Sequence, residues 1–342
     1  MELLSHLGIA PAPNATFRSL LLQLRGYLVL WILLRFTVIY HVVSAISSSF
    51  SLLSFETDYI KRMSCFCFWR IVSCFIKLNN VTINVSGDAL STSSAIVISN
   101  HQSLADYAIL AHLASNCGTL CPQPNFFTWF SLWRVPSVKT VYNMLKCDEN
   151  WTLHKSWADS LFKRVLRSEL PEWVILFPEV NIKTPTVTYL QQVQSKRYYL
   201  PEFEHVLYPR FSGLHSAITS LSRTPESKFD TLYDITISYE PQPPSLMQFF
   251  ASDKPLVVYV DVQMKPLSRV PLKRSKLEGW LEKTWMEKEK YLESNKGNQE
   301  QGEASSRSRS ILDVPLLTIW KTRAGSTFDN IAKQSSQKNQ FS

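Results

Sequence analysis

The feature that most constrains this chain is an apolar run that covers residues 26–46. Its length matches the ~20 residues that an α-helix needs to cross ~30 Å of hydrocarbon, so it predicts a membrane-associated helix. Arg35 lies near its centre, where insertion costs roughly 2.5–3.5 kcal/mol, so such a helix must tilt, re-enter or pair that charge. Arg18 and Arg25 flank the run directly, which disfavours a cleaved signal peptide. We expect the segment to stay attached.

Residues 55–77 mix lysine and arginine with phenylalanine, tryptophan and isoleucine at helical intervals. Such a segment is either an interfacial amphipathic helix or an ordinary core-packing helix, and the pattern leaves both open. Positive charge is denser after the apolar run than before it, which predicts that the bulk of the chain lies in the cytosol. The sequons at Asn80, Asn84 and Asn150 would then stay unglycosylated. Residues 1–78 are therefore the predicted membrane anchor with its interfacial helix.

Charge and cysteine content narrow the class of protein. The 36 Lys and Arg residues against 28 Asp and Glu residues give a net charge of +8, which favours anionic surfaces or substrates. No dense basic tract interleaved with aromatic residues is present, so we expect no nucleic-acid partner. The six cysteines lack the paired C-x-x-C spacing of zinc sites, and we expect neither a metal site nor a disulfide framework.

From residue 79 onward the sequence has the pattern of an α/β domain. Residues 81–87 alternate like a strand, and short apolar runs at residues 95–99 and 173–177 are typical of buried strands. Later strands are predicted at residues 233–239 and 257–264, with helices at residues 157–170 and 273–292. We therefore predict a mixed β-sheet flanked by helices over residues 79–292. Residues 293–342 are predicted to form a polar, largely disordered tail.

A histidine and an aspartate five residues apart follow the buried strand at residues 95–99. They are His101 and Asp106, placed where α/β sheets usually present active-site groups. A carboxylate bonded to one imidazole nitrogen leaves the other nitrogen free to act as a base on a substrate hydroxyl. The same spacing recurs at His154 and Asp159, but within a segment of helical periodicity, so we interpret that pair as solvated or packing residues. With no G-x-S-x-G nucleophile nearby, direct attack by a substrate alcohol is favoured, which indicates a transferase.

Three ordered blocks of this sequence resemble those of the lysophosphatidic acid acyltransferase (PlsC-like) superfamily of glycerolipid acyltransferases. The sequence NHQSLAD at residues 100–106 resembles the NHQS-x-x-D block, FPEV at 177–180 the FPEG block, and VLYPRFSGL at 206–214 the later V-L-x-P-R-x-x-G block. The N-terminal anchor and the long C-terminal extension are similar to the lysocardiolipin, lysophosphatidylglycerol and lysophosphatidylinositol acyltransferase branch.

The resemblance implies roles for individual residues. His101 would be the general base and Asp106 its partner. Glu179 and Asn100 would help to bind the acceptor, while Pro209 and Arg210 would shape its pocket. Acyl-CoA is the implied cosubstrate, and no cofactor is implied.

Two departures from the family pattern bear on the acceptor site. Val180 replaces the family's glycine, and a β-branched residue would be strained there if the backbone needs a positive φ. The arginine that the family uses for the acceptor phosphate is absent from its usual block, so Lys146 or the upstream Arg134 would have to serve. A solvated surface lysine is the alternative for Lys146.

The sequence thus predicts an acyl-CoA-dependent acyltransferase acting on a lysophospholipid with an anionic head group, which we take to be inositol or a similar group. Its expected partners are acyl-CoA, the lysophospholipid and the bilayer, and its expected location is the endoplasmic reticulum membrane with the active site facing the cytosol. Two alternatives stay open: acylation of lysophosphatidic acid, and a non-catalytic membrane protein that binds lipid.

Overall fold

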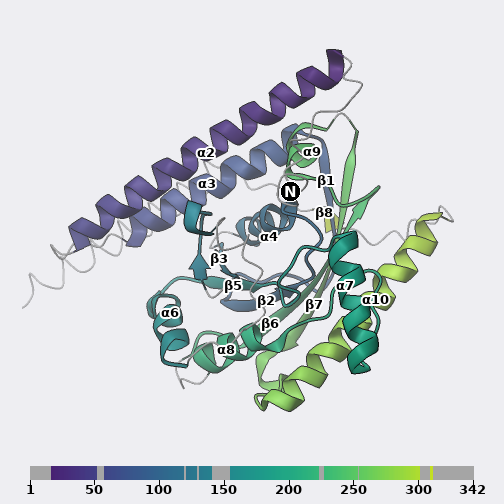
Figure 1. Cartoon of the computed structure of the whole chain (residues 1–342). Coiled ribbons are helices and arrows are strands. Elements are labelled where there is room, and N and C mark those ends of the chain that lie inside the picture. Colours follow the sequence, from purple (N-terminus) through teal and green to yellow (C-terminus); the bar gives the residue numbers. More distant parts are fainter. Residues whose placement is uncertain are drawn as a thin grey trace, which may run out of the picture.

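A mixed β-sheet forms the centre of the protein (Figure 1), as the sequence predicts. The computed structural model describes residues 17–51, 58–118, 121–128, 131–140, 155–222, 227–252, 254–300 and 309–310. The strands run in the order β4-β3-β5-β2-β6-β7-β1-β8. Their bounds are β1 (Val81–Gly87), β2 (Ala95–Ser99), β3 (Gln123–Thr128), β4 (Ser131–Trp133), β5 (Glu172–Leu176), β6 (Thr231–Glu240), β7 (Leu256–Pro266) and β8 (Arg309–Ser310).

The middle of the sheet is parallel. Strands β3, β5, β2 and β6 run in one direction, and β7 pairs antiparallel with β6. Strand β2 therefore lies between two parallel neighbours, and its five residues are all buried. This explains why residues 95–99 form a continuous apolar run rather than an alternating one.

Helices cover both faces of the sheet. Their bounds are α2 (Phe17–Ser51), α3 (Asp58–Leu78), α4 (Ala105–Ser115), α6 (Lys155–Arg167), α7 (Pro185–Tyr198), α8 (Phe211–Leu221), α9 (Leu246–Ala251) and α10 (Arg274–Glu300). The first core cluster joins α3, α4 and α9 to one face, and the second joins α6, α8 and α10 to the other. Along β2, Ala95 and Val97 belong to the first cluster and Ile96 and Ile98 to the second.

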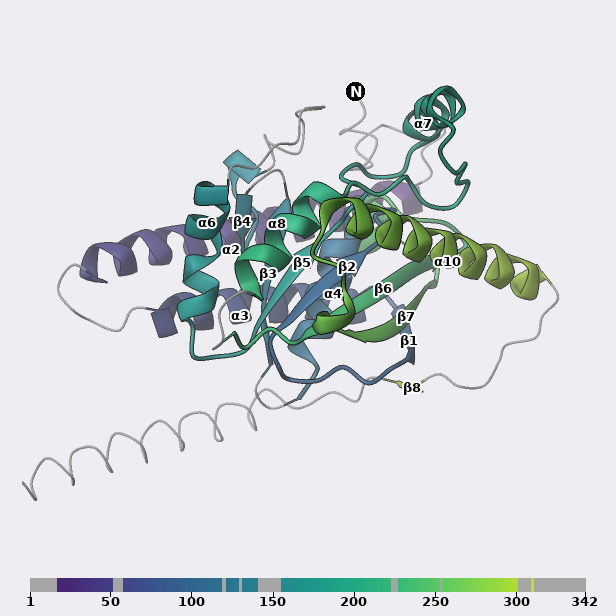
Figure 2. The same cartoon turned by 90° about the horizontal axis from the view of Figure 1, so that it is seen from below.

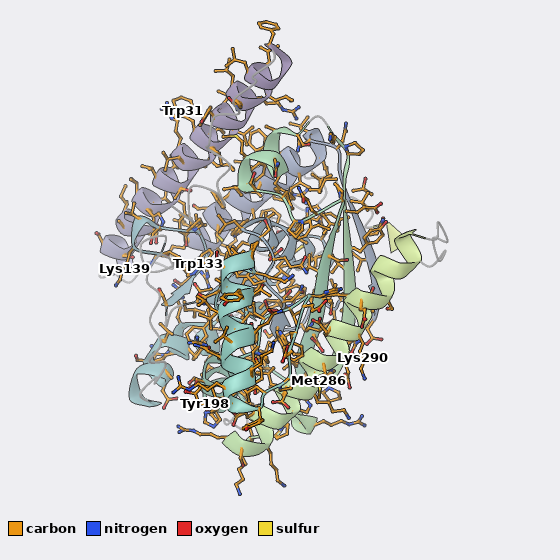
Figure 3. The ribbon with its side chains drawn as sticks, turned by 45° about the vertical axis from the view of Figure 1, so that its right-hand side comes forward. Trp31, Trp133, Lys139, Tyr198, Met286 and Lys290 are labelled. Atoms are coloured by element: carbon orange, nitrogen blue, oxygen red, sulfur yellow. The ribbon has the colours of Figure 1, made fainter. Side chains whose placement is uncertain are left out.

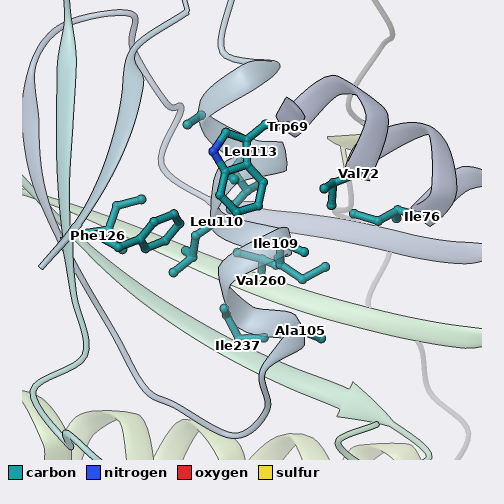
Figure 4. Packing of buried hydrophobic residues seen from close by; sticks show 14 of the residues in the cluster. Trp69, Val72, Ile76, Ala105, Ile109, Leu110, Leu113, Phe126, Ile237 and Val260 are labelled. Carbon is teal, nitrogen blue, oxygen red and sulfur yellow. The ribbon is translucent and has the colours of Figure 1, made fainter. Parts of the chain in front are cut away.

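The segment predicted at residues 55–77 is a core-packing helix. Helix α3 buries one face against α4 and the sheet, and Figure 4 shows several of its side chains packed with those of α4 and β3, among them Trp69, Val72, Ile76, Leu110, Leu113 and Phe126. Cys65 is buried in this face, whereas Cys67 and Cys74 are exposed. Of the two readings that the sequence left open, the structure favours the core helix.

The apolar run lies within α2, which extends over 35 residues along α3 and α9 (Figure 1). Residues Leu20–Ser49 make it long and apolar enough to cross a membrane, by length and composition, and no other helix in the described part of the chain is. Most of this stretch is not buried in the protein, and Trp31 points away from the domain (Figure 3).

The predicted strands are all present, but the C-terminal helix is longer than the sequence indicated. Helix α10 continues to Glu300, eight residues beyond the predicted end at Leu292. The strand β8 pairs with β1 at Val85 and Asn84. The boundary of the C-terminal tail stays a prediction, since residues 301–308 and 311–342 lie outside the described part.

Candidate active site

The loop between β2 and α4 carries His101 at the carboxyl end of a central parallel strand. Asn100 fixes the start of this loop, because its side-chain amide donates to the Ile237 carbonyl and its side-chain oxygen accepts from the Ile237 N–H, both at 2.8 Å. Asn100 is fully buried by these contacts with β6. In the structure, Asn100 therefore positions the start of the His101 loop against β6. The contact with substrate that the resemblance implied stays a prediction.

His101 and Asp106 meet as the sequence spacing allowed. His101 Nδ1 lies 2.9 Å from Asp106 Oδ2, and the carboxylate also accepts from the backbone N–H groups of Gln102 (2.7 Å) and Ser103 (2.9 Å). Its other oxygen accepts from the Tyr239 hydroxyl. Because an ionised carboxylate is only an acceptor, Nδ1 carries the proton and Nε2 of the neutral ring is left with its lone pair. Among the described residues, Nε2 has no hydrogen-bond partner.

Aromatic rings hold the imidazole in one orientation. Phe177 stacks on it with centroids 4.1 Å apart and an interplanar angle of 19°, and Tyr107 meets it edge-on at 5.2 Å. The histidine is 2% exposed. Packing against these two rings and the Asp106 hydrogen bond together hold the imidazole in a fixed geometry for proton transfer.

A pocket lies beside these rings and is lined by residues of two of the three sequence blocks, FPEV and VLYPRFSGL, together with Tyr107, which directly follows the third block. The Arg210 N–H donates to the Pro178 carbonyl at 2.8 Å, which joins the loop after β5 to the start of α8. Arg210 lines the pocket, whereas Pro209 beside it is buried. The lining residues are mainly apolar: Tyr107, Phe127, Thr128, Leu176, Phe177, Pro178, Val180, Arg210, Gly213 and Leu214.

Glu179 faces the protein core rather than this pocket. Its neighbours Pro178 and Val180 line the pocket, but Glu179 itself is buried and its Oε1 accepts from Trp285 Nε1 of α10 at 3.0 Å. Burial raises the pKa of Glu179 from its usual 4.5 to about 8, against the opposing effects of the Trp285 hydrogen bond and Lys288. At neutral pH the carboxyl group is therefore mostly protonated. Direct contact between Glu179 and the acceptor stays a prediction.

Val180 adopts a backbone conformation that is strained for a β-branched residue. Its φ is +69°, in the left-handed region that favours glycine. The valine side chain lines the pocket, so it occupies space that a glycine would leave open.

The two residues predicted as alternative phosphate-binding cations are Lys146 and Arg134. Lys146 lies outside the described residues, and its role stays a prediction. Arg134 is buried, with Nη2 3.0 Å from Glu172 Oε1 and Nε 3.0 Å from Asn125 Oδ1. Glu172 begins β5, at the opposite end of the strand from the FPEV block, and also binds Arg62. The expectation that Arg134 serves the acceptor phosphate is therefore wrong, because its guanidinium is held in this buried ion cluster.

The second histidine–aspartate pair is described only at its aspartate. Asp159 accepts from the Ser220 hydroxyl at 2.8 Å and so joins α6 to α8, while His154 lies outside the described residues. Sequence reasoning missed Tyr239 and the stacking ring of Phe177. Tyr239 carries no local signal, since it lies far along the chain from Asp106. Across the described residues, no cluster of three or more His, Cys, Asp or Glu side chains is placed to hold a metal ion.

The fold and the site define a class of protein: an α/β domain with an anchored histidine–aspartate pair that can deprotonate a hydroxyl beside an apolar pocket. No protein-family model matches the chain. Curated proteins do. The probable 1-acyl-sn-glycerol-3-phosphate acyltransferase 5 of Arabidopsis thaliana is 23% identical over 82% of this chain and 76% of its own length.

Two further relatives carry other lipid names. Lysocardiolipin acyltransferase 1 of Gallus gallus is 23% identical over 61% of this chain and 56% of its own length. Lysophosphatidylinositol acyltransferase 10 of Caenorhabditis elegans is 24% identical over 63% of this chain and 56% of its own length. The chain thus spans little more than half the length of these two proteins. The solved structure of the acyltransferase PlsC from Thermotoga maritima is 13% identical, with a TM-score of 0.42 over 80% of this chain and 96% of that one.

The curated relatives share one reaction type and differ in the lipid they are named for. These relatives support an assignment to the PlsC-like superfamily of glycerolipid acyltransferases and an enzyme that acylates lysophospholipids. The resemblance seen in its three sequence blocks is confirmed.

Proposed function

We propose that this enzyme transfers the acyl group of acyl-CoA to the free hydroxyl of a lysophospholipid. The observation that carries the proposal is the 2.9 Å contact between His101 Nδ1 and the buried Asp106 carboxylate. It leaves Nε2 as a base, and the pocket beside it is mainly apolar, as an acyl chain requires.

The reaction balances with groups that this chain supplies. His101 Nε2 takes the proton of the lysophospholipid hydroxyl while the oxygen attacks the thioester carbonyl carbon. The carbon–oxygen bond forms, the carbon–sulfur bond breaks, and the imidazolium returns the proton to the departing CoA thiolate. Asp106 stabilises the transient imidazolium through the Nδ1 hydrogen bond. This scheme uses no metal and no cofactor besides the cosubstrate.

The acceptor we propose carries an anionic head group, such as inositol phosphate. Arg210 supports this choice, because it lines the pocket and arginine binds phosphate well. A relative named for lysophosphatidylinositol supports it too. The Arabidopsis relative, named for 1-acyl-sn-glycerol-3-phosphate, keeps lysophosphatidic acid as the second candidate. The apolar outer face of α2 supports membrane association, and we place the active site on the cytosolic face of the endoplasmic reticulum.

The test is an acyl-transfer assay with purified protein, labelled acyl-CoA and a series of lysophospholipids that differ in head group. We expect transfer to an anionic lysophospholipid and a loss of ~10²–10⁴-fold in rate for His101→Ala, because that change removes the general base. His154→Ala, the matched control from the second H-x4-D pair, should keep its rate within a few fold.

Two results would contradict the proposal. Full transfer by His101→Ala would remove the base assigned here. A wild-type enzyme that acylates only neutral lysophospholipids would leave the chemistry in place and overturn the head-group assignment.

A further inference from the structure

Helix α7 stands clear of the rest of the protein (Figure 2). It joins the FPEV block to the VLYPR block, so the chain on either side of it borders the pocket. Of its fourteen residues, only Ser195 is buried. The helix is well formed nonetheless, with Thr184 Oγ1 accepting from the Val187 N–H at its start and Pro185 in its first turn.

One side of α7 exposes apolar and aromatic side chains. Tyr189 is 66% exposed, Leu190 56% and Val193 50%. Tyr198, at the end of the helix (Figure 3), and Tyr199, which follows it, are also exposed. Residues 189, 190 and 193 lie on one side of a helix because their spacing is close to 3.6 residues per turn. A contiguous apolar side of this kind on an exposed helix is typical of an interaction surface.

The charge on this segment has one sign. Lys183, Lys196 and Arg197 are its cations, and residues 180–201 contain no aspartate or glutamate. Lys196 and Arg197 are exposed beside the aromatic residues. Tyrosine together with lysine and arginine is the composition that favours the interface between water and an anionic lipid surface.

Both ends of α7 are tied to the catalytic part of the molecule. Before the helix, the Lys183 N–H donates to the carbonyl oxygen of His101 at 3.0 Å. After it, the N–H groups of Glu204, His205 and Val206 donate to the Glu289 carboxylate of α10. The helix is therefore held at a fixed place next to the pocket while its own surface stays uncovered.

We propose that α7 is a membrane-contact helix that lies on the anionic lipid surface beside the mouth of the pocket. This inference rests on the proposed function in one respect, since a lysophospholipid acceptor resides in that surface. A second copy of the chain fits less well, because two copies of this surface would bring only cations together, with no acidic side chain from residues 180–201 to pair with them. The contact is separate from α2, which packs on α3 and α9.

Hydrogen exchange measured by mass spectrometry tests this surface without requiring turnover. The full-length protein is bound to vesicles of phosphatidylcholine and to the same vesicles with phosphatidylserine added. We expect amide exchange across residues 185–199 to slow by roughly tenfold on the anionic vesicles relative to the neutral ones. The exposed stretch Leu272, Lys273 and Arg274 should exchange equally on both.

Matched variants separate the apolar from the electrostatic contribution. Tyr189→Gln/Leu190→Gln/Val193→Gln should lose the protection, and Leu272→Gln, at an equally exposed apolar residue, should keep it. Lys196→Gln/Arg197→Gln should abolish the difference between the two vesicle types, and Lys273→Gln/Arg274→Gln should not. Because these side chains are exposed, all four variants should unfold at the wild-type temperature.

Several results would overturn the inference. Equal exchange in residues 185–199 on both vesicle types would show that α7 has no preference for anionic lipid. Protection that rises with protein concentration at fixed lipid would show that this face binds a second copy of the chain. Protection by acyl-CoA without vesicles would assign it to closure over the pocket. Protection on anionic vesicles without any acyl transfer would support the membrane contact of α7 and contradict the proposed function. Acyl transfer without protection would support the proposed function and contradict the membrane contact.

Discussion

Val180 holds a left-handed backbone conformation that costs a non-glycine residue of order 1–3 kcal/mol. The surrounding contacts hold it there, since the Val180 N–H donates to the Phe177 carbonyl at 3.0 Å in the turn that follows β5. The strain lies within the pocket wall, so the residue that stores it also limits the space for the acceptor.

This strain predicts the order of stability of two variants. At an ordinary φ, alanine is more stable than glycine by roughly 0.5–1 kcal/mol, but at a positive φ that order reverses. We expect Val180→Gly to have a higher free energy of unfolding than Val180→Ala, by about 1 kcal/mol, when both are measured by denaturant titration. A more stable alanine variant would show that the turn carries no such strain.

The residue-level picture was predictable where it depends on neighbours in sequence. The contact of His101 with Asp106 follows from a spacing that straddles the start of a helix, and that contact is confirmed, while its catalytic role stays a prediction. The burial of Glu179 against Trp285 was not predictable, because it depends on a helix that packs from far along the chain. The same reason hid the hydroxyl of Tyr239.

Helix α10 positions the loops of the site through a series of polar side chains. Trp285 binds Glu179, and the Glu282 carboxylate accepts from the Tyr208 hydroxyl at 2.7 Å. Lys288 binds Asp234 and the carbonyl oxygen of Ile235 within the sheet. Although the helix lies far from His101 in sequence, it contacts both loops that border the pocket, the one that carries Glu179 and the one that carries Tyr208.

Glu289 makes the most concentrated of these contacts. Its carboxylate accepts from the successive backbone N–H groups of Glu204, His205 and Val206 at 2.7–3.0 Å. Glu289→Ala leaves these donors without their charged partner, so we expect the free energy of unfolding to fall by ~2–3 kcal/mol in a denaturant titration. Exposed Glu287 on the same helix is the matched control, and Glu287→Ala should change stability by less than about 0.5 kcal/mol. Equal effects of the two substitutions would show that the loop does not depend on this carboxylate.

At the scale of elements, burial on both sides explains which strands the sequence predicted. Residues 95–98 and 173–177 are apolar throughout because both sheet faces are covered there. Strand β3 was missed because Gln123 and Asn125 are polar yet buried, the latter through its hydrogen bonds with Glu172 and Arg134. A polar residue that is satisfied by a distant partner looks, in sequence, like a loop residue.

The whole molecule constrains how α2 meets the membrane. Gly26 lets α2 approach α9 closely, since a Cβ there would lie 1.9 Å from Met247 Sδ. Arg25 donates to the Leu78 carbonyl at 2.9 Å, and His41 Nε2 lies 3.2 Å from the Pro136 oxygen. The central part of α2 is therefore held against the folded domain. If α2 crossed the bilayer perpendicularly, the part of the domain packed against it would have to enter the hydrocarbon.

Arg35 points to the same orientation. It is exposed on the outer side of α2, with its guanidinium 4.6 Å from the ring centre of Trp31. In a perpendicular span this charge would lie near the bilayer centre, whereas in a helix that lies in the plane of the interface it can extend to the head groups. The apolar residues around it would still be buried in lipid.

We therefore expect both ends of α2 to lie on the cytosolic side of the membrane. The measurement uses Phe17→Cys and Ser49→Cys, one at each end, in a background in which the exposed Cys67 and Cys74 are serine. A thiol reagent that cannot cross membranes is added to sealed microsomes, and the in-plane helix predicts that both cysteines react. Reaction at only one end would show that α2 spans the bilayer, which would require its contacts with Leu78 and Pro136 to break in the membrane.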